Sequence, residues 1–169
     1  MLIGVLFSLS FVYLDTNARG IGRHRVTFNN PYGVTYYRVA PGHIGVKSLL
    51  DKDLIDCIAM DVKAPLEDDL YARLIGTTFD INELKESIEI IRNSGIEAIF
   101  RLTVVPNLLT EDDIYRVARD LAPVKKFILQ QFSPEDALDP TLRRISPWPQ
   151  EELDRIQQRV DEIIIGGSE

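Results

Sequence analysis

The chain has 169 residues, of which 45% are hydrophobic and 27% are charged, a composition typical of one soluble domain with a core of its own. Its formal net charge of −7 argues against a protein that binds nucleic acid or an anionic membrane. The single cysteine, Cys57, excludes a disulfide within the chain and a metal site made of several of its cysteines.

The first fourteen residues, MLIGVLFSLSFVYL, carry no charged side chain. They lack the basic start and the small-residue cleavage site of a signal peptide, and they fall short of the roughly 20 apolar residues that span a bilayer. We therefore expect a core segment that ends in a strand, in a cytoplasmic protein without a membrane anchor.

Residues 16–50 differ in composition from the rest of the chain. They contain five basic residues and no acidic ones, so they carry +5 and the remainder carries −12. A phosphate loop around Gly20 and Gly22 is weakly supported, because no helical pattern follows the glycines. A basic patch for nucleic acid is an equally weak alternative. We expect an atypical basic insertion at the surface, without assigned chemistry.

From residue 51 onward, short apolar runs alternate with segments of helical periodicity. LIDCIAM, IEAIFRLTVV and KKFILQQF are rich in Ile, Val and Phe and predict buried strands. Strands that alternate with helices in this way are typical of an α/β protein with a parallel sheet.

The helical segments carry recognisable start and stop signals. Asp80 and Glu83 predict a capping box, and Gly95 stands where a glycine commonly follows a helix. Thr110 predicts the cap of the next helix, and the last helix is expected to begin at about Gln150. The residues expected to face the core are Leu84, Ile88, Ile91, Ile114, Val117, Ala118, Leu121, Leu153, Ile156, Val160 and Ile163.

Polar side chains occur near the end of each predicted strand, where α/β proteins bind their ligands. Lys63 and Arg101 suit a carboxylate or phosphate, whereas Asp15 and Asp61 suit a hard cation, ribose hydroxyls or an ammonium group. An alternative is that Asp61 and Lys63 only pair with each other or with nearby loops. The other polar residues of this kind are Asn17, Thr103, Gln130 and Gln131.

Four segments together resemble one enzyme family. YLDTN, LIDCIAMDVKAPL, IRNSGIEAIFRLTVVPNLLTEDDI and FILQQFSPEDALDP are similar, in this order, to the second half of radical S-adenosylmethionine (SAM) enzymes. The similarity is to activating enzymes of glycyl radical enzymes, such as the activating proteins of anaerobic ribonucleotide reductase and of pyruvate formate-lyase. It implies the C-terminal portion of a partial (β/α) barrel with parallel strands. Residues 1–169 would then be a single incomplete domain, family-like over 51–165.

The resemblance also implies roles for particular residues. The D-T-N motif and the Asp of M-D-x-K would hold the methionyl end of SAM, in some members through a monovalent cation that Asp15 and Asp61 would bind. Lys63 would approach the SAM carboxylate. The remaining positions that match the family's cofactor-binding strands and motifs, with a looser match on the last strand, are Thr16, Asn17, Arg101, Thr103, Val105, Gln131 and Ser133.

The chain departs from the family in two motifs. The C-x3-C-x2-C motif that binds a 4Fe–4S cluster and the G-G-E motif that binds the SAM amino group are not found in the sequence. Cys57 is expected to be a small core residue in mid-strand. We therefore expect the chain alone not to cleave SAM to the 5′-deoxyadenosyl radical. It would be a truncated product, a pseudo-enzyme or one piece of a split enzyme. Its partner would be a complementary N-terminal half or a glycyl radical enzyme.

Two alternatives and one structural expectation follow from the same residues. The chain could be a non-catalytic α/β module that binds a nucleotide, or a fragment of a (β/α)-barrel lyase or isomerase with Lys63 as a Schiff-base lysine. The latter needs a depressed lysine pKa, which the nearby Asp61 opposes. A partial barrel also exposes the edge of its first strand, and we expect the apolar residues 2–11 to cover that edge.

Overall fold

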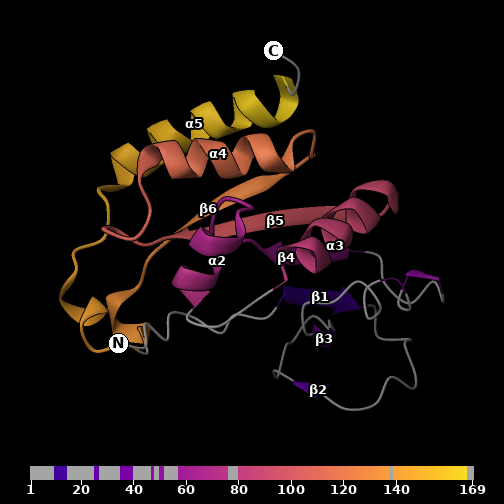
Figure 1. Ribbon diagram of the computed structural model, residues 1–169, viewed down its shortest axis with the longest axis horizontal. Helices are drawn as coiled ribbons and strands as arrows, with labels where there is room; N and C mark the ends of the chain where they lie inside the picture. The colour runs from indigo at the N-terminus through magenta and orange to yellow at the C-terminus, as the bar shows by residue number, and fades with distance from the viewer. Residues whose placement is uncertain are drawn as a thin grey trace. The chain divides into compact units, whose positions relative to one another are not determined.

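Figure 1 shows the computed structural model, in which residues 10–14, 25–26, 35–39, 47, 50–51, 57–75, 80–137 and 139–166 are described. These residues belong to two compact units, which we describe separately. One unit includes residues 9–61 and 82–99, and the other includes residues 62–81 and 100–169.

The first unit contains an antiparallel set of strands. Strand β1 (Ser10–Leu14) lies between β3 (Thr35–Val39) and β4 (Cys57–Asp61) and is antiparallel to both, and the short β2 (Arg25–Val26) pairs with β3. The expectation that the first strand is parallel to the later ones is therefore wrong. Parallel neighbours need a crossover connection, whereas β2 and β3, which lie between β1 and β4 in the sequence, form an antiparallel arrangement.

Helix α3 (Ile81–Asn93) is the amphipathic helix of this part of the chain. It begins directly after Asp80, and Leu84, Ile88 and Ile91 are each 2% exposed, which confirms the predicted buried stripe. Gly95 follows the helix with a φ of 77°, a left-handed conformation that glycine adopts without the clash a Cβ atom would cause. The capping box of Asp80 with Glu83 stays a prediction.

The second unit contains most of the parallel part of the fold. Strand β5 (Glu97–Val104) and strand β6 (Phe127–Gln131) run parallel, with Phe100 opposite Phe127 and Leu102 opposite Leu129. With β4 they are three parallel strands that alternate with helices. The sheet is not closed, since β6 has a neighbour on one side only among the strands that the structure describes. The α/β class is confirmed, and membership of a partial barrel stays a prediction.

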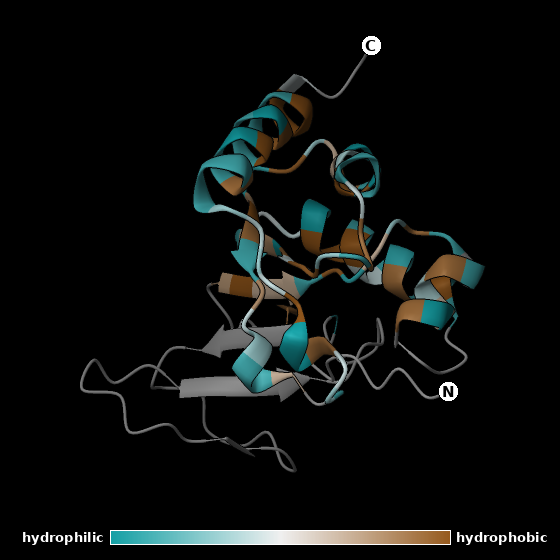
Figure 2. Cartoon of the chain, turned by 90° about the vertical axis from the view of Figure 1, so that its left-hand side faces the viewer, coloured by the Kyte–Doolittle hydropathy of each residue, from teal (hydrophilic) through white to brown (hydrophobic). Residues whose placement is uncertain are grey.

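Helices α4 (Glu111–Leu121) and α5 (Gln150–Gly166) lie side by side over one face of β5 and β6 (Figure 1). Alternate residues of β5 point to this face and are almost completely buried, and Phe100, Leu102 and Val104 are 1%, 0% and 0% exposed. Figure 2 shows that the helices are hydrophobic along one side and hydrophilic along the other.

The predicted caps and buried faces of these two helices are largely confirmed. Thr110 caps α4: its hydroxyl oxygen accepts the Asp113 N–H, and the Asp113 carboxylate accepts the Thr110 N–H. Helix α5 begins at Gln150, but Ile164 takes the buried place predicted for Ile163, which is only half-buried. Positions three and four residues after Val160 both lie on its side of the helix, so periodicity alone does not choose between them. The buried residues of the two helices are Ile114, Val117, Ala118, Leu121, Leu153, Ile156, Val160 and Ile164.

Three shorter elements lie between the longer ones. Helix α2 (Asp68–Ile75) follows β4, and two 3₁₀ turns, η1 (Pro134–Asp136) and η2 (Leu142–Arg144), lie between β6 and α5. Among the residues described, no helix is both long enough and apolar enough to span a membrane.

An ion pair joins α4 to α5. Arg155 donates two hydrogen bonds to the Glu111 carboxylate, at 2.9 and 2.7 Å, and the Tyr115 hydroxyl donates a third at 2.5 Å. The hydrogen bonds from Arg155 and Tyr115 lower the pKa of Glu111 from 4.5 to about 2. Burial, together with the hydrogen bond to Glu111, raises the pKa of Tyr115.

The outer edge of β6 is paired with a side chain of α5. The Leu129 N–H donates to Gln157 Oε1 at 2.7 Å, and Gln157 Nε2 donates to the Phe127 carbonyl at 2.8 Å. One side-chain amide therefore makes the two hydrogen bonds that a neighbouring strand would make.

We predict that Gln157→Ala lowers the free energy of unfolding by about 1–2 kcal/mol, because two backbone groups of β6 lose their partner. Urea unfolding followed by circular dichroism measures the change. The matched control is Gln158→Ala, an exposed neighbour on the same helix, for which we expect a change within about 0.5 kcal/mol. Equal effects of the two substitutions would show that the amide of Gln157 does not stabilise the edge.

We predict that the stabilisation from Glu111 depends on pH. Because its folded-state pKa of about 2 lies below its ordinary value of 4.5, the contribution is fully present above pH 4.5 and is lost as the pH falls toward 2. The Glu111 side chain is 35% exposed, so solvent screening keeps the effect small. The difference in unfolding free energy between the wild type and Glu111→Gln should shrink over this range. Glu152→Gln, at a carboxylate 4.0 Å from Arg155, is the control, and a difference for Glu111→Gln that does not change with pH would contradict the prediction.

Candidate functional site

The candidate site lies near the carboxyl ends of the parallel strands. The Val62 N–H donates to the Arg101 carbonyl at 2.8 Å, which in a parallel ladder places Val62 beside Leu102, and both side chains are 0% exposed. Because side chains alternate, Lys63 then shares the opposite face with Arg101 and Thr103, all three half-buried. The register of β5 with β6 adds Gln130, opposite Thr103.

Asp61 is the last residue of β4 and is 8% exposed. It stands two residues before Lys63 in the sequence. A carboxylate and an ammonium group separated by one apolar residue can recognise a ligand that carries both charges, such as an amino acid group. Asp61 is therefore the acidic candidate of the site among the described residues.

The residues after β4 form a tightly packed loop. Val62 and Ala64 are 0% exposed and Leu66 is 9% exposed, whereas Lys63 is only half-buried. The backbone N–H of Lys63 donates to the Tyr71 hydroxyl of α2 at 3.2 Å, and Tyr71 itself is 5% exposed. The only basic side chain of residues 62–67 therefore starts from a backbone that is held in place.

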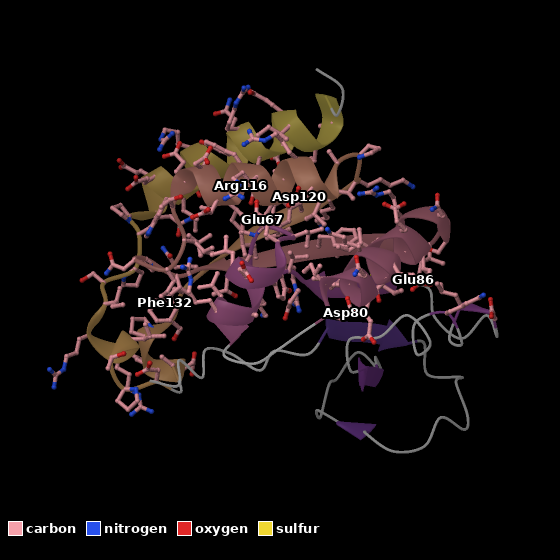
Figure 3. All side chains as sticks on the ribbon, viewed as in Figure 1. Glu67, Asp80, Glu86, Arg116, Asp120 and Phe132 are labelled. Carbon is pink, nitrogen blue, oxygen red and sulfur yellow. The ribbon has the colours of Figure 1, made fainter. Side chains whose placement is uncertain are left out.

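The other predicted site residues lie on or beside the loops that follow β5 and β6. Val105 is 4% exposed and packs in a hydrophobic cluster with Phe132, Ala137 and Leu142, of which Phe132 is labelled in Figure 3. This cluster stabilises the loops at the carboxyl ends of both strands, so Val105 has a packing role whatever else it does.

Two further predicted residues are exposed. Gln131 ends β6, and its Nε2 donates to the Trp148 carbonyl at 2.7 Å, which ties β6 to the segment before α5. Ser133 precedes η1 and makes no side-chain hydrogen bond to cap it. Neither residue is buried in a way that fixes its side chain for a ligand, and their roles stay predictions.

Asp15, Thr16 and Asn17 lie outside the described residues. The direction of strand β1, which precedes them, affects their predicted role. Tyr13, near the end of β1, pairs with Cys57 at the start of β4, whereas Asp61 is the last residue of β4. Strand β1 therefore ends beside the start of β4. The predicted arrangement, in which all strands end at one side, does not hold for β1.

Sequence reasoning did not identify two residues that contact the loop after β4. Tyr71 belongs to the unpredicted helix α2, and Asp120 lies in α4, where its carboxylate accepts the Leu66 N–H. A sequence signal exists for Asp120, because a carboxylate in the last turn of a helix is unfavourable for the helix dipole and suggests another role.

The residues present do not fit an iron–sulfur cluster. Cys57 is half-buried on β4, and it is the one cysteine of the sequence, whereas the family's cluster needs three thiolates. In the part of the chain that the structure describes, no three His, Cys, Asp or Glu side chains are grouped to hold a metal ion. The charges present do suit SAM: Lys63 carries the charge that a carboxylate needs, and Asp61 carries the charge that an ammonium group needs.

Comparison with known proteins gives one relative. No family model matches the chain, and no solved structure matches it significantly. The chain is 29% identical over 129 residues to a protein of Methanocaldococcus jannaschii whose name describes it as a candidate glycyl-radical enzyme activating enzyme. The match covers 71% of this chain and 52% of the relative, so the chain spans about half the relative's length. The chain is therefore distantly homologous to a protein named for this activity.

Proposed function

We propose that this chain binds SAM at the carboxyl ends of its parallel strands, as the SAM-binding part of an activating enzyme for a glycyl radical enzyme. The observation that carries the proposal is the half-buried face that Lys63 shares with Arg101 and Thr103. The distant homology to a protein named as a candidate activating enzyme supports the choice of ligand.

Each residue is assigned a contact by its chemistry. The Lys63 ammonium group binds the carboxylate of SAM, and the Asp61 carboxylate binds its ammonium group, directly or through a monovalent cation. Arg101 and Thr103 support the nucleoside. The remaining residues of the proposed site lie at or directly after the ends of β5 and β6, and they are Val105, Gln131 and Ser133.

In radical SAM enzymes, SAM supplies the radical that abstracts a hydrogen atom from the substrate. The 169 residues of this chain hold one cysteine, so the thiolates of a cluster would have to come from elsewhere. We therefore propose that the chain works with a protein segment that carries them and acts on a glycyl radical enzyme. What the chain's own residues contribute is the binding and orientation of SAM.

We predict that Lys63→Ala weakens SAM binding about 10- to 100-fold, because a charge-assisted hydrogen bond to the SAM carboxylate is lost. Isothermal titration calorimetry measures the affinity. Lys125→Ala, at an exposed lysine between α4 and β6, is the matched control and should leave the affinity within about twofold of the wild type.

A second ligand separates recognition of the carboxylate from general damage to the site. Methylthioadenosine keeps the nucleoside and the sulfur of SAM but lacks its amino acid group, so Lys63→Ala should not weaken its binding. Unchanged SAM affinity in Lys63→Ala, or no SAM binding by the wild type, would refute the proposed function. Binding of ATP but not SAM, dependent on Lys63, would favour the non-catalytic nucleotide-binding module instead.

A further inference from the structure

Two side chains of α4 hold the loop that carries Lys63. The Leu66 N–H donates to Asp120 Oδ2 at 2.9 Å, and Arg116 forms an ion pair with the Glu67 carboxylate. Figure 3 shows Glu67, Arg116 and Asp120 close together between α2 and α4. The partners are 54 and 49 residues apart in the sequence, so these are tertiary contacts that join the loop after β4 to the helix after β5.

The rest of the same loop is also fixed. The N–H groups of Val62 and Lys63 donate to the Arg101 carbonyl and the Tyr71 hydroxyl, and the Glu67 N–H donates to the Pro65 carbonyl at 2.7 Å. Contacts before and after Lys63 therefore determine the direction in which its side chain leaves the backbone. After Lys63, the side chains that contact the loop from elsewhere in the fold are Arg116 and Asp120 of α4.

The position of Asp120 in its helix is informative. It lies in the last turn of α4, where the partial negative charge of the helix end disfavours a carboxylate. It is also an exposed residue, so the buried core of α4 does not require it. The hydrogen bond that its carboxylate accepts from the Leu66 N–H explains why an acidic residue stands at this unfavourable position of the helix.

Arg116 extends the contact toward the start of α4. Its second guanidinium nitrogen donates to Asp113 Oδ1 at 3.2 Å, and the other Asp113 oxygen accepts hydrogen bonds from the N–H and hydroxyl of Thr110, at 2.9 and 2.7 Å. A continuous set of polar contacts thus runs from Glu67 to the cap of α4. The loop after β4 is tied to both ends of the helix that follows β5.

We propose that Asp120 and Arg116 are positioning residues: they hold the 62–67 loop so that Lys63 is directed toward its ligand before the ligand arrives. The inference rests on the SAM-binding function proposed for Lys63. A loop that is already ordered loses less conformational entropy on binding, so the affinity for the charged end of the ligand is higher. Neither residue needs to touch the ligand.

The test compares Asp120→Ala with Asp120→Asn, which keeps an oxygen that can accept the Leu66 N–H. We expect Asp120→Ala to speed amide hydrogen exchange in residues 62–67 while α5 stays protected, and to weaken SAM binding about 3- to 10-fold. Asp120→Asn should restore both to within about twofold of the wild type. Asp112→Ala, which removes another exposed aspartate of α4, is the matched control and should change neither.

Two further measurements distinguish positioning from general destabilisation. Asp120→Ala should leave methylthioadenosine binding unchanged, because that ligand does not use Lys63. Arg116→Gln and Glu67→Gln should each speed exchange in the same loop. The double variant should be no worse than Arg116→Gln alone, because that substitution already removes the partner of Glu67.

Unchanged exchange in residues 62–67 of Asp120→Ala would overturn the inference, as would unchanged SAM affinity or an Asp120→Asn variant as defective as Asp120→Ala. Failure of the proposed function gives a different result. If the wild type binds no SAM, the role in ligand binding falls with that function, and the exchange rates alone decide whether α4 holds the loop.

Discussion

The hydrogen bond from the Val62 N–H to the Arg101 carbonyl determines much of what the site can be. It sets the register of the chain after β4 against β5, and from that register follow the buried face with Val62 and Leu102 and the half-buried face with Lys63 and Thr103. A shift by one residue would exchange the two faces and place Lys63 among the buried apolar side chains. The large cost of burying an unpaired ammonium group there excludes that alternative.

Core and site therefore depend on the same ladder. The apolar side chains of β5 and β6 pack under α4 and α5, and this packing holds the strands whose opposite faces carry the polar residues. Helix α4 serves both purposes: Ile114 and Val117 are 0% exposed in the core, while Arg116 and Asp120 contact the loop after β4. One side of α4 thus packs in the core, while Arg116 and Asp120 of the same helix contact the loop.

Local patterns in the sequence were sufficient for much of the fold, since Thr110 as a cap and the buried stripes of α3 and α4 depend on residues within a few positions of each other. The direction of β1 could not be predicted in this way, because an apolar strand has the same pattern whether its partners are parallel or antiparallel. Alternation put Arg101 and Thr103 on one face, but no local pattern reports that Asp120 meets Leu66, 54 residues away. Tyr71 was missed because α2 has only eight residues.

The pairing of Gln157 with β6 limits how this fold can be extended. Its amide occupies the donor and acceptor positions of Leu129 and Phe127, which an added strand would need on that side. A protein segment that joins the sheet beside β6 would first have to displace this side chain and move α5 with it. The side chain of Gln157 therefore hinders the pairing of another chain with this edge of β6. Because unpaired strand edges promote aggregation, this one glutamine also protects against it.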